Sequence, residues 1–233
     1  MEAVILAGGL GTRLNSRLTG LPKPMAPIAG RPFLEILLDA LVGAGCSRII
    51  LSVGHLREVI INHFGESYRG VPVRYVVEET PLGTGGAIRR ALRETSEAAV
   101  FVLNGDTYLD VDYAQMHTAH AALGGTITIA VAPVNEMVRY GGVAIDGDYV
   151  TGFIEKGRTG FGWINAGVYA LDRDFPWPDN LPTRFSFETD VLAEYVTQLR
   201  PAVFRCRGQF LDIGTPEDLD RAQTELTARA RPD

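Results

Sequence analysis

The sequence predicts an α/β fold: a doubly wound, mostly parallel mixed sheet with helices on both faces. Over the first 132 residues, short apolar runs rich in branched residues alternate with stretches whose apolar residues recur at helical spacing. Such alternation is typical of parallel strands joined by helical crossovers. Beyond residue 133, three strand-like runs follow one another without a long helix between them. We therefore expect an antiparallel region added to the same sheet.

The elements of the first part follow from the spacing of the apolar residues. Gly45 and Gly65 stand where two of the helices should end, as glycine often does at a helix C-terminus. The expected strands are 3–7, 48–53, 73–77, 99–103 and 126–132. The expected helices are 33–44, 55–64, 84–93 and 113–123.

The second part begins with the three strands and ends with two helices. Ser186 can cap the first helix. Thr215 offers an N-cap hydroxyl to the second, Pro216 suits its first position, and two acids follow in the first turn. No repeat or linker divides the chain, so we expect a single domain over residues 1–233. The expected strands are 142–145, 149–155 and 164–171, and the helices are 187–199 and from 216 onward.

Composition and charge limit the functions to consider. Of the 233 residues, 46% are hydrophobic and 21% charged, as in an ordinary soluble globular protein. The net charge of −6 argues against a nucleic-acid-binding surface. No charged leader with an apolar core and no run of 18 apolar residues is present, which argues against export and membrane spanning. Cys46 and Cys206 form no Cys-x-x-Cys pair, so we expect a reduced, cytoplasmic protein without structural zinc.

The first expected strand runs into a glycine-rich turn. Gly8, Gly9 and Gly11 let the backbone turn sharply and approach a ligand closely. The backbone N–H groups that such a turn exposes suit phosphate oxygens. Arg13 adds a permanently charged guanidinium, and Lys23 adds a compact ammonium. We interpret this segment as a cradle for a triphosphate.

Two common phosphate-binding motifs do not fit this turn. The P-loop requires Lys and then Ser or Thr after its second glycine, but Thr12 and Arg13 follow Gly11. The dinucleotide fingerprint requires a glycine where Leu14 stands. An ordinary glycine-rich turn would also contain the glycines. The longer string L-A-G-G-x-G-T-R-L, followed by P-K-P, resembles the opening of the sugar-phosphate nucleotidylyltransferases.

This resemblance covers most of residues 2–220 and implies a Rossmann-like nucleotidyltransferase fold. It also implies a nucleotide-binding half at 1–132 and a sugar-phosphate-binding half at 133–233. The strings P-K-P-M-A-P-I, P-L-G-T-G-G-A-I and L-N-G-D-T are similar to the branch that activates D-glycero-D-manno-heptose 1-phosphate with GTP. The nucleotide-binding residues that the motifs imply are Leu6, Ala7, Gly8, Gly9, Gly11, Thr12, Arg13, Glu78, Gly83, Thr84 and Asn104.

Two glutamates precede a second glycine-rich string. Glu78 and Glu79 stand shortly before P-L-G-T-G-G-A, at the end of an expected strand. A carboxylate can accept from both donors on one edge of guanine, and the glycines would let the flat base lie against backbone. From the residues alone, a solvated loop end fits as well. The string resembles the base-recognition segment of the guanylyl-transferring members, which implies Glu78 as the base reader and Glu79 as the alternate.

Aspartates follow two strand-like runs. Asp106 closes the string L-N-G-D, and Asp212 stands in a similar context. Mg²⁺ prefers oxygen ligands and commonly takes one or two carboxylates together with substrate phosphates. Taken singly, each aspartate also fits a turn or a cap. Together they resemble the metal pair of the family, which implies Mg²⁺ as the cofactor, with Asp110 and Asp112 as rivals for Asp106.

Three segments of the second part are similar to those that hold the sugar phosphate in the family: R-Y-G-G-V, F-I-E-K-G and N-A-G-V-Y. The resemblance implies that Glu155 and Asn165 hydrogen-bond sugar hydroxyls. It implies that Gly141 lets the ring approach the backbone and that Lys156 holds the acceptor phosphate. By composition alone, Glu155 and Lys156 would be an exposed ion pair.

The activity that the resemblance implies is a magnesium-dependent guanylyl transfer from GTP to a sugar 1-phosphate. The anionic sugar phosphate would attack the α-phosphorus in line, with Arg13, Lys23 and Asp106 as the catalytic residues. One alternative is a uridylyl- or other nucleotidylyltransferase for a sugar such as mannose or N-acetylmuramate 1-phosphate, and another is a non-catalytic regulator. We expect no nucleic-acid or membrane partner, and the sequence leaves a homo-oligomer open.

Overall fold

The computed structural model describes residues 1–9, 11, 14 and 17–227. Its strands in the first part are β1 (Glu2–Leu6), β2 (Pro27–Ile28), β3 (Arg31–Pro32), β4 (Arg48–Val53), β5 (Ser67–Tyr68), β6 (Val71–Val77), β7 (Ala99–Asn104), β8 (Thr107–Leu109) and β9 (Ile127–Val134). The later strands are β10 (Gly142–Asp146), β11 (Tyr149–Ile154), β12 (Gly162–Asp172), β13 (Ala202–Arg205) and β14 (Phe210–Asp212).

Six α-helices and several tighter or wider turns complete the described part of the chain. The α-helices are α1 (Phe33–Gly43), α2 (Arg57–Phe64), α3 (Gly83–Ala91), α4 (Tyr113–Leu123), α5 (Val196–Leu199) and α6 (Pro216–Glu225). Two 3₁₀ turns, η2 (Lys23–Met25) and η3 (Leu92–Glu94), and a π-helical segment, η4 (Glu188–Ala193), are also present. Among these described helices, none has both the length and the apolar character needed to cross a membrane.

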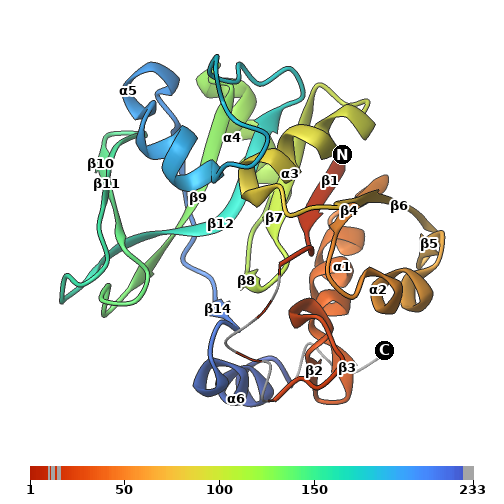
Figure 1. Cartoon of the computed structure of the whole chain (residues 1–233). Coiled ribbons are helices and arrows are strands. Elements are labelled where there is room, and N and C mark those ends of the chain that lie inside the picture. Colours follow the sequence, from red (N-terminus) through yellow and green to blue (C-terminus); the bar gives the residue numbers. More distant parts are fainter. Residues whose placement is uncertain (10, 12–13, 15–16, 228–233) are drawn as a thin grey trace.

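One sheet of ten strands forms the centre, in the order β10-β11-β13-β9-β12-β7-β1-β4-β6-β5. In its first part, β7, β1, β4 and β6 run parallel to one another. β12 then lies antiparallel between β7 and β9, and the β10–β11 hairpin forms the far end (Figure 1). The expected fold class is therefore confirmed, including the antiparallel region added to the same sheet.

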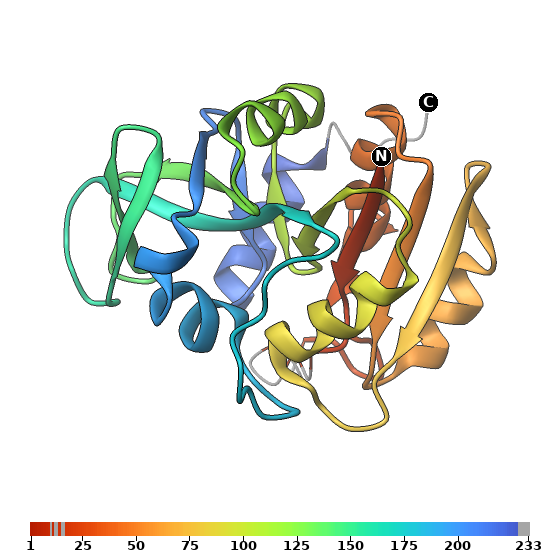
Figure 2. The same ribbon diagram turned by 90° about the horizontal axis from the view of Figure 1, so that it is seen from above.

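Both faces of the sheet are buried, which explains why residues 3–6 of the first strand are all apolar. Ala3 and Ile5 of β1 pack into one hydrophobic cluster, whereas Val4 between them packs into the other. This alternation follows from the two-residue period of a strand. Helices α1, α2, α4 and α6 contribute to the first cluster, and α3 and η4 contribute to the second. Figure 2 shows the helices distributed on both sides of the sheet.

Helix α6 closes the end of the molecule near the carboxyl ends of the parallel strands. It begins as expected, with the Thr215 hydroxyl accepting from the backbone N–H of Asp218 at 3.3 Å and with Pro216 in first position. Gln223 binds the β2–β3 turn, where its Oε1 accepts from the N–H of Ala29 at 3.0 Å. Figure 1 shows α6 beside this turn and next to β14.

The structure differs from the expected elements in several places, including the short strands β2, β3, β5, β8 and β14, which were not expected. Residues 187–199 form η4 and the separate short helix α5 instead of one helix, although the Ser186 hydroxyl accepts from the Thr189 N–H at 3.2 Å as a cap should. β13 is not among the expected strands. It pairs in parallel with β9, a partner far earlier in the chain that local spacing does not reveal.

Candidate active site

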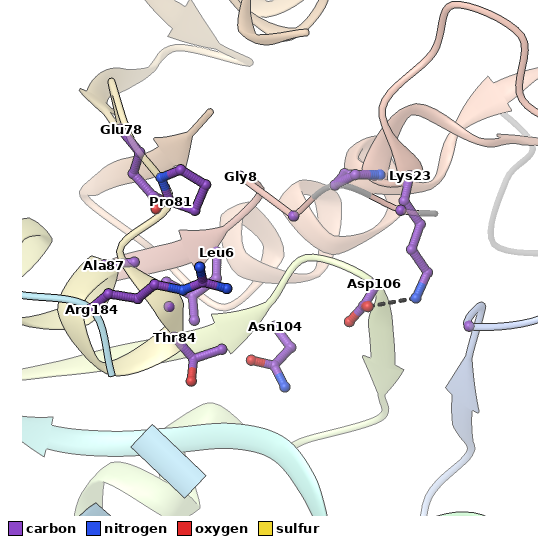
Figure 3. Close-up of a pocket in the computed structure, with 15 residues that line it drawn as sticks. Leu6, Gly8, Lys23, Glu78, Pro81, Thr84, Ala87, Asn104, Asp106 and Arg184 are labelled. Atoms are coloured by element: carbon purple, nitrogen blue, oxygen red, sulfur yellow. Dashed lines mark hydrogen bonds and ion pairs between the residues drawn. The ribbon is translucent and has the colours of Figure 1, made fainter. Parts of the chain in front are cut away.

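A cavity of about 460 Å³ opens at the carboxyl ends of β1, β6 and β7 (Figure 3). This is where ligands collect in open α/β sheets, because the loops that follow parallel strands meet there. The predicted residues that line it are Leu6, Gly8, Gly9, Gly11, Lys23, Glu78, Gly83, Thr84, Asn104 and Asp106. The other lining residues are Pro24, Pro81, Ala87, Arg184 and Gly214.

The glycine-rich turn forms one wall of the cavity. A Cβ on Gly8 would lie 2.6 Å from Glu78 Oε1, so a larger residue at this position would displace the carboxylate. Gly11 has a φ of 59°, a conformation that glycine adopts without strain. Ala7 does not line the cavity, because it is fully buried and its N–H donates to the Ser52 carbonyl. Thr12 and Arg13 lie outside the described residues, so their predicted roles stay predictions.

Lys23 and two aspartates converge at the edge of the cavity. Lys23 is buried, and its Nζ lies 2.5 Å from Asp106 Oδ2 and 3.8 Å from Asp212 Oδ1. The β8–β14 ribbon brings the aspartates together, because it pairs Asp212 with Thr107, the neighbour of Asp106. Burial and the charge of Asp106 raise the pKa of Asp212, although Lys23 acts in the opposite direction. Two carboxylates thus share one ammonium, so the three side chains of Lys23, Asp106 and Asp212 together carry a net negative charge.

The rival aspartates are placed differently. The Asp112 side chain accepts from the N–H of Gln115 at 2.9 Å and caps α4. Asp110 is exposed, and a Cβ on Gly208 would lie 2.6 Å from its Cβ. Both lie along a second, smaller cavity between α1 and α4, not along the one that contains Asp106.

Of the two glutamates after β6, only Glu78 lines the cavity. Its Oε1 accepts from the Ser52 hydroxyl at 2.9 Å, and its Oε2 accepts from the N–H of Leu82 at 3.1 Å. Each oxygen keeps a second lone pair, so the carboxylate can still accept from a ligand. Glu79 instead lies at the surface and pairs with Arg57 at 3.1 Å. The assignment of base reading to Glu78 remains a prediction.

The glycines after Glu78 serve a packing role that the sequence did not suggest. A Cβ on Gly85 would lie 2.2 Å from the Phe185 ring, and one on Gly83 would lie 2.3 Å from the Phe185 carbonyl oxygen. The backbones also bond to each other, because the Gly85 N–H donates to Phe185 O at 3.0 Å and the Phe185 N–H donates to Leu82 O at 3.0 Å. These glycines therefore hold segment 182–187 against α3.

Replacing Gly85 with Ala should destabilise the protein. The added methyl group overlaps a ring that is 2% exposed and lies under the guanidinium of Arg89, and overpacking of this kind costs about 1–3 kcal/mol. Chemical denaturation of Gly85→Ala measures the loss in free energy of unfolding. Gly43→Ala is the matched control, since a Cβ there meets nothing within 4 Å at the end of α1. Equal stability of the two variants would contradict this packing role.

Segment 182–187 also supplies a residue that sequence reasoning missed. Arg184 is exposed and lines the cavity, and Figure 3 shows its side chain extending into it. No pattern in the sequence marks this arginine, because it stands in an irregular stretch between a proline and a buried aromatic residue. It adds a positive charge to the side of the cavity that lies across from Lys23.

Two polar residues at the cavity differ in how well they are bonded. The Thr84 hydroxyl donates to Glu188 at 2.6 Å and accepts from the N–H of Phe187 at 2.8 Å. Asn104, by contrast, has a buried Oδ1 without a hydrogen-bond partner among the described residues. A buried, unpaired polar atom at a cavity wall costs free energy until a ligand or a rotation of the amide satisfies it.

The four predicted acceptor residues do not line this cavity but lie on the adjoining part of the sheet. Gly141 has a φ of 73° and lies against Lys156, whose Cγ would be 3.6 Å from an added Cβ. Glu155 and Lys156 are exposed at the end of β11. Asn165 lies on β12, where its Oδ1 accepts from the N–H of Gly167 at 3.1 Å. Since Gly167 in turn packs against Asn104, Asn165 is near the cavity wall.

The position of this cavity, where a glycine turn and a lysine face the carboxyl ends of parallel strands, is typical of nucleotide-binding proteins of the α/β class. The comparison with protein families gives the particular family. The model for nucleotidyl transferases matches residues 2–229, and the chain belongs to this family.

Individual relatives match the chain over almost its whole length. The D-glycero-alpha-D-manno-heptose 1-phosphate guanylyltransferase of Aneurinibacillus thermoaerophilus is 42% identical over 97% of this chain and 98% of its own length. The protein of the same name from Campylobacter jejuni is 40% identical over 94% of this chain and 96% of its own length. HddC from Yersinia pseudotuberculosis is 37% identical in sequence. Its crystal structure superposes on 97% of this chain and 99% of its own chain with a TM-score of 0.84. A second structure of HddC is a complex with GMP-PN.

Proposed function

We propose that this protein transfers the guanylyl group of GTP to D-glycero-D-manno-heptose 1-phosphate and releases pyrophosphate. The observation that carries this proposal is the identity of 40–42%, over at least 94% of the chain, with two guanylyltransferases for this sugar phosphate. The complex of HddC with GMP-PN supports a guanine nucleotide as the donor. Because GTP is a cytoplasmic metabolite, we place the reaction in the cytoplasm.

GTP would occupy the cavity with its base at Glu78 and its phosphates at the glycine-rich turn. The Glu78 carboxylate is held by Ser52 and Leu82 and can accept from N1–H and the exocyclic amine of guanine. Lys23 and Arg184 line the cavity as cations, and we assign them, with Arg13, to the triphosphate. The phosphates would thus meet two cationic side chains in a chain of net charge −6, while the carboxylates of Glu78 and Asp106 line other parts of the same cavity.

The donor set at Asp106 and Asp212 fits a divalent cation, for which we propose Mg²⁺. Among the described residues the two carboxylates share Lys23 as their counter-ion, and the pKa of Asp212 is raised by burial and by the charge of Asp106. Carboxylate oxygens completed by substrate phosphates are a common ligand set for Mg²⁺. No cluster of three or more His, Cys, Asp or Glu side chains occurs in the described ranges, so phosphates would have to complete the set. When bound, the cation supplies positive charge to the phosphate oxygens.

The chain contributes alignment and charge to the reaction. The nucleophile, an oxygen of the sugar 1-phosphate, is already anionic and needs no general base. Holding it in line with the α-phosphorus lowers the entropic part of the barrier. Lys23 and Arg13 would neutralise the charge that develops on the departing pyrophosphate. For the acceptor we assign Lys156 to its phosphate, Glu155 and Asn165 to sugar hydroxyls, and Gly141 to the close approach of the ring.

A screen of pyrophosphate release tests the proposed substrates. Each of the four nucleoside triphosphates is paired with heptose 1-phosphate, mannose 1-phosphate and N-acetylmuramate 1-phosphate, and kcat/KM is measured for every pair. We expect the pair of GTP and heptose 1-phosphate to give the highest value. A higher kcat/KM with UTP would indicate a uridylyltransferase. A higher kcat/KM with mannose 1-phosphate would indicate a mannose-1-phosphate guanylyltransferase. No release with any pair would support a non-catalytic binding protein.

Glu78→Gln should weaken the preference for GTP over UTP. The amide offers one donor and one acceptor, which suits uracil better and guanine worse than a carboxylate does. A hydrogen bond to a charged group contributes about 1.5–3 kcal/mol, so the GTP:UTP ratio of kcat/KM should fall by at least about tenfold. Glu79→Gln is the control, because Glu79 pairs with Arg57 at the surface. An unchanged ratio in Glu78→Gln would leave base selection to backbone groups.

A further inference from the structure

The loop between β9 and β10 is bound to helix α6 by a two-pronged ion pair. Arg139 Nη1 donates to Asp218 Oδ1 at 2.9 Å, and Arg139 Nη2 donates to Asp218 Oδ2. The Asp218 residue is 1% exposed and also accepts from the Thr215 hydroxyl at 2.8 Å. Such a fork fixes direction as well as distance, because two parallel hydrogen bonds join two planar groups.

A second contact binds the same loop to the strand that carries Asp212. The ring of Tyr140 meets the ring of Phe210 edge-on, with centroids 5.3 Å apart. Phe210 is the first residue of β14 and Asp212 is its last. The loop is therefore attached on both sides of Asp212, to Phe210 before it and to Asp218 after it.

The other side of the loop contacts the segment that carries Lys156. A Cβ on Gly141 would lie 2.8 Å from the Ile154 carbonyl oxygen and 3.6 Å from Lys156 N. The N–H of Gly157 donates to the Val138 carbonyl at 3.0 Å. Residues 138–141 thus touch the acceptor segment and the aspartate segment at the same time.

Arg139 and Asp218 supply the side-chain hydrogen bonds between this loop and α6. Within the described part of the chain, their hydrogen bonds are the ones that join side chains of residues 133–172 to α6. Arg221 also lies near Asp218, at 3.7 Å, but it belongs to α6 itself, and its two ion pairs, with Asp218 and Glu225, lie within this helix. An ion pair that served only to stabilise α6 could be formed by Asp218 and Arg221 of the same helix, without Arg139.

We propose that Arg139 and Asp218 are a positioning pair, which holds the acceptor segment with Gly141 and Lys156 at a set place relative to Asp106 and Asp212. This inference rests on the proposed function for the role of Lys156 as the ligand of the acceptor phosphate. Neither member of the pair lines the cavity. They act through the loop, so that the attacking phosphate and the α-phosphorus are aligned, where misplacement by about 1 Å can cost roughly a hundredfold in rate.

The test compares Arg139→Gln and Arg139→Lys with Arg221→Gln. In Arg139→Gln we expect kcat to fall and KM for heptose 1-phosphate to rise, with kcat/KM for the acceptor reduced by about tenfold to a hundredfold. The dissociation constant for GTP, measured by calorimetry, should stay within about twofold of wild type, since the cavity is unchanged. Arg139→Lys keeps the charge but loses the two-pronged hydrogen bond, so its kcat/KM for the acceptor should lie between those of wild type and Arg139→Gln. Arg221→Gln should behave as wild type in every assay.

Hydrogen exchange separates this inference from the proposed function. In Arg139→Gln the amides of residues 138–141 and 154–157 should exchange faster than in wild type or Arg221→Gln, whatever the substrate is. Unchanged exchange would overturn the positioning role even if wild-type protein transferred no nucleotide at all. A parallel loss of GTP affinity in Arg139→Gln, or equal acceptor kinetics in Arg139→Gln and Arg221→Gln, would overturn it as well.

Discussion

Asp106→Asn and Asp212→Asn should each lower turnover by roughly 10²- to 10³-fold while the protein stays folded, an effect of the size seen when one preorganised electrostatic group is removed. Asn has the shape of Asp, so Lys23 keeps an oxygen within reach of its Nζ, and the β8–β14 pairing uses only backbone groups. What each variant loses is one negative charge from the proposed cation site.

The control for this pair is Asp110→Asn, which changes an exposed carboxylate outside the cavity and should leave turnover near the wild-type value. Turnover is measured at saturating GTP over a range of Mg²⁺ concentrations, and circular dichroism verifies the fold. Near-normal activity of both Asp106→Asn and Asp212→Asn at limiting Mg²⁺ would show that these aspartates do not hold the cation.

Lys23→Met should lower kcat by about a hundredfold, or ~3 kcal/mol in the barrier. Methionine fills a similar buried volume but removes the ammonium that stands 2.5 Å from Asp106. The variant would then lack the charge that we assign to the departing pyrophosphate. Because that charge develops during the reaction, the loss should fall on kcat more than on the affinity for GTP.

Lys23→Arg tests whether charge alone is sufficient at this position. Lys23 is 9% exposed and lies on a 3₁₀ turn between two prolines, so the larger guanidinium does not fit the same space. We expect partial activity in Lys23→Arg, above that of Lys23→Met. If Lys23→Met kept the wild-type kcat, Lys23 would not act in the reaction and would serve only as the counter-ion of the two aspartates.

Local spacing was sufficient to predict most strands of the large sheet but not the shortest strands. β4 and α4 have the predicted bounds, and each is followed by a glycine, Gly54 and Gly124. β13 was missed, since a four-residue strand is short and its parallel partner β9 lies far away in sequence. β8 and β14, three residues each, pair only with one another as strands, in a separate two-stranded sheet.

The site residues that stand within sequence motifs could be predicted. Those brought to the cavity by contacts between distant segments were missed. The sequence could rank Glu78 above Glu79 only by resemblance. In the structure Glu78 accepts from the hydroxyl of Ser52, which no motif contains, whereas Glu79 pairs with Arg57 at the surface. Arg184 is brought to the cavity by the fit of Phe185 against glycines about one hundred residues earlier. Such a contact between distant segments leaves no local pattern.

The transfer itself can be followed with heptose 1-phosphate that carries ¹⁸O in its phosphate. Incubation with GTP and Mg²⁺, followed by mass spectrometry, should give GDP-heptose that retains every labelled oxygen and an equal amount of unlabelled pyrophosphate, because a sugar phosphate oxygen attacks the α-phosphorus. Label in the released pyrophosphate or orthophosphate, or the absence of GDP-heptose, would contradict guanylyl transfer at this site.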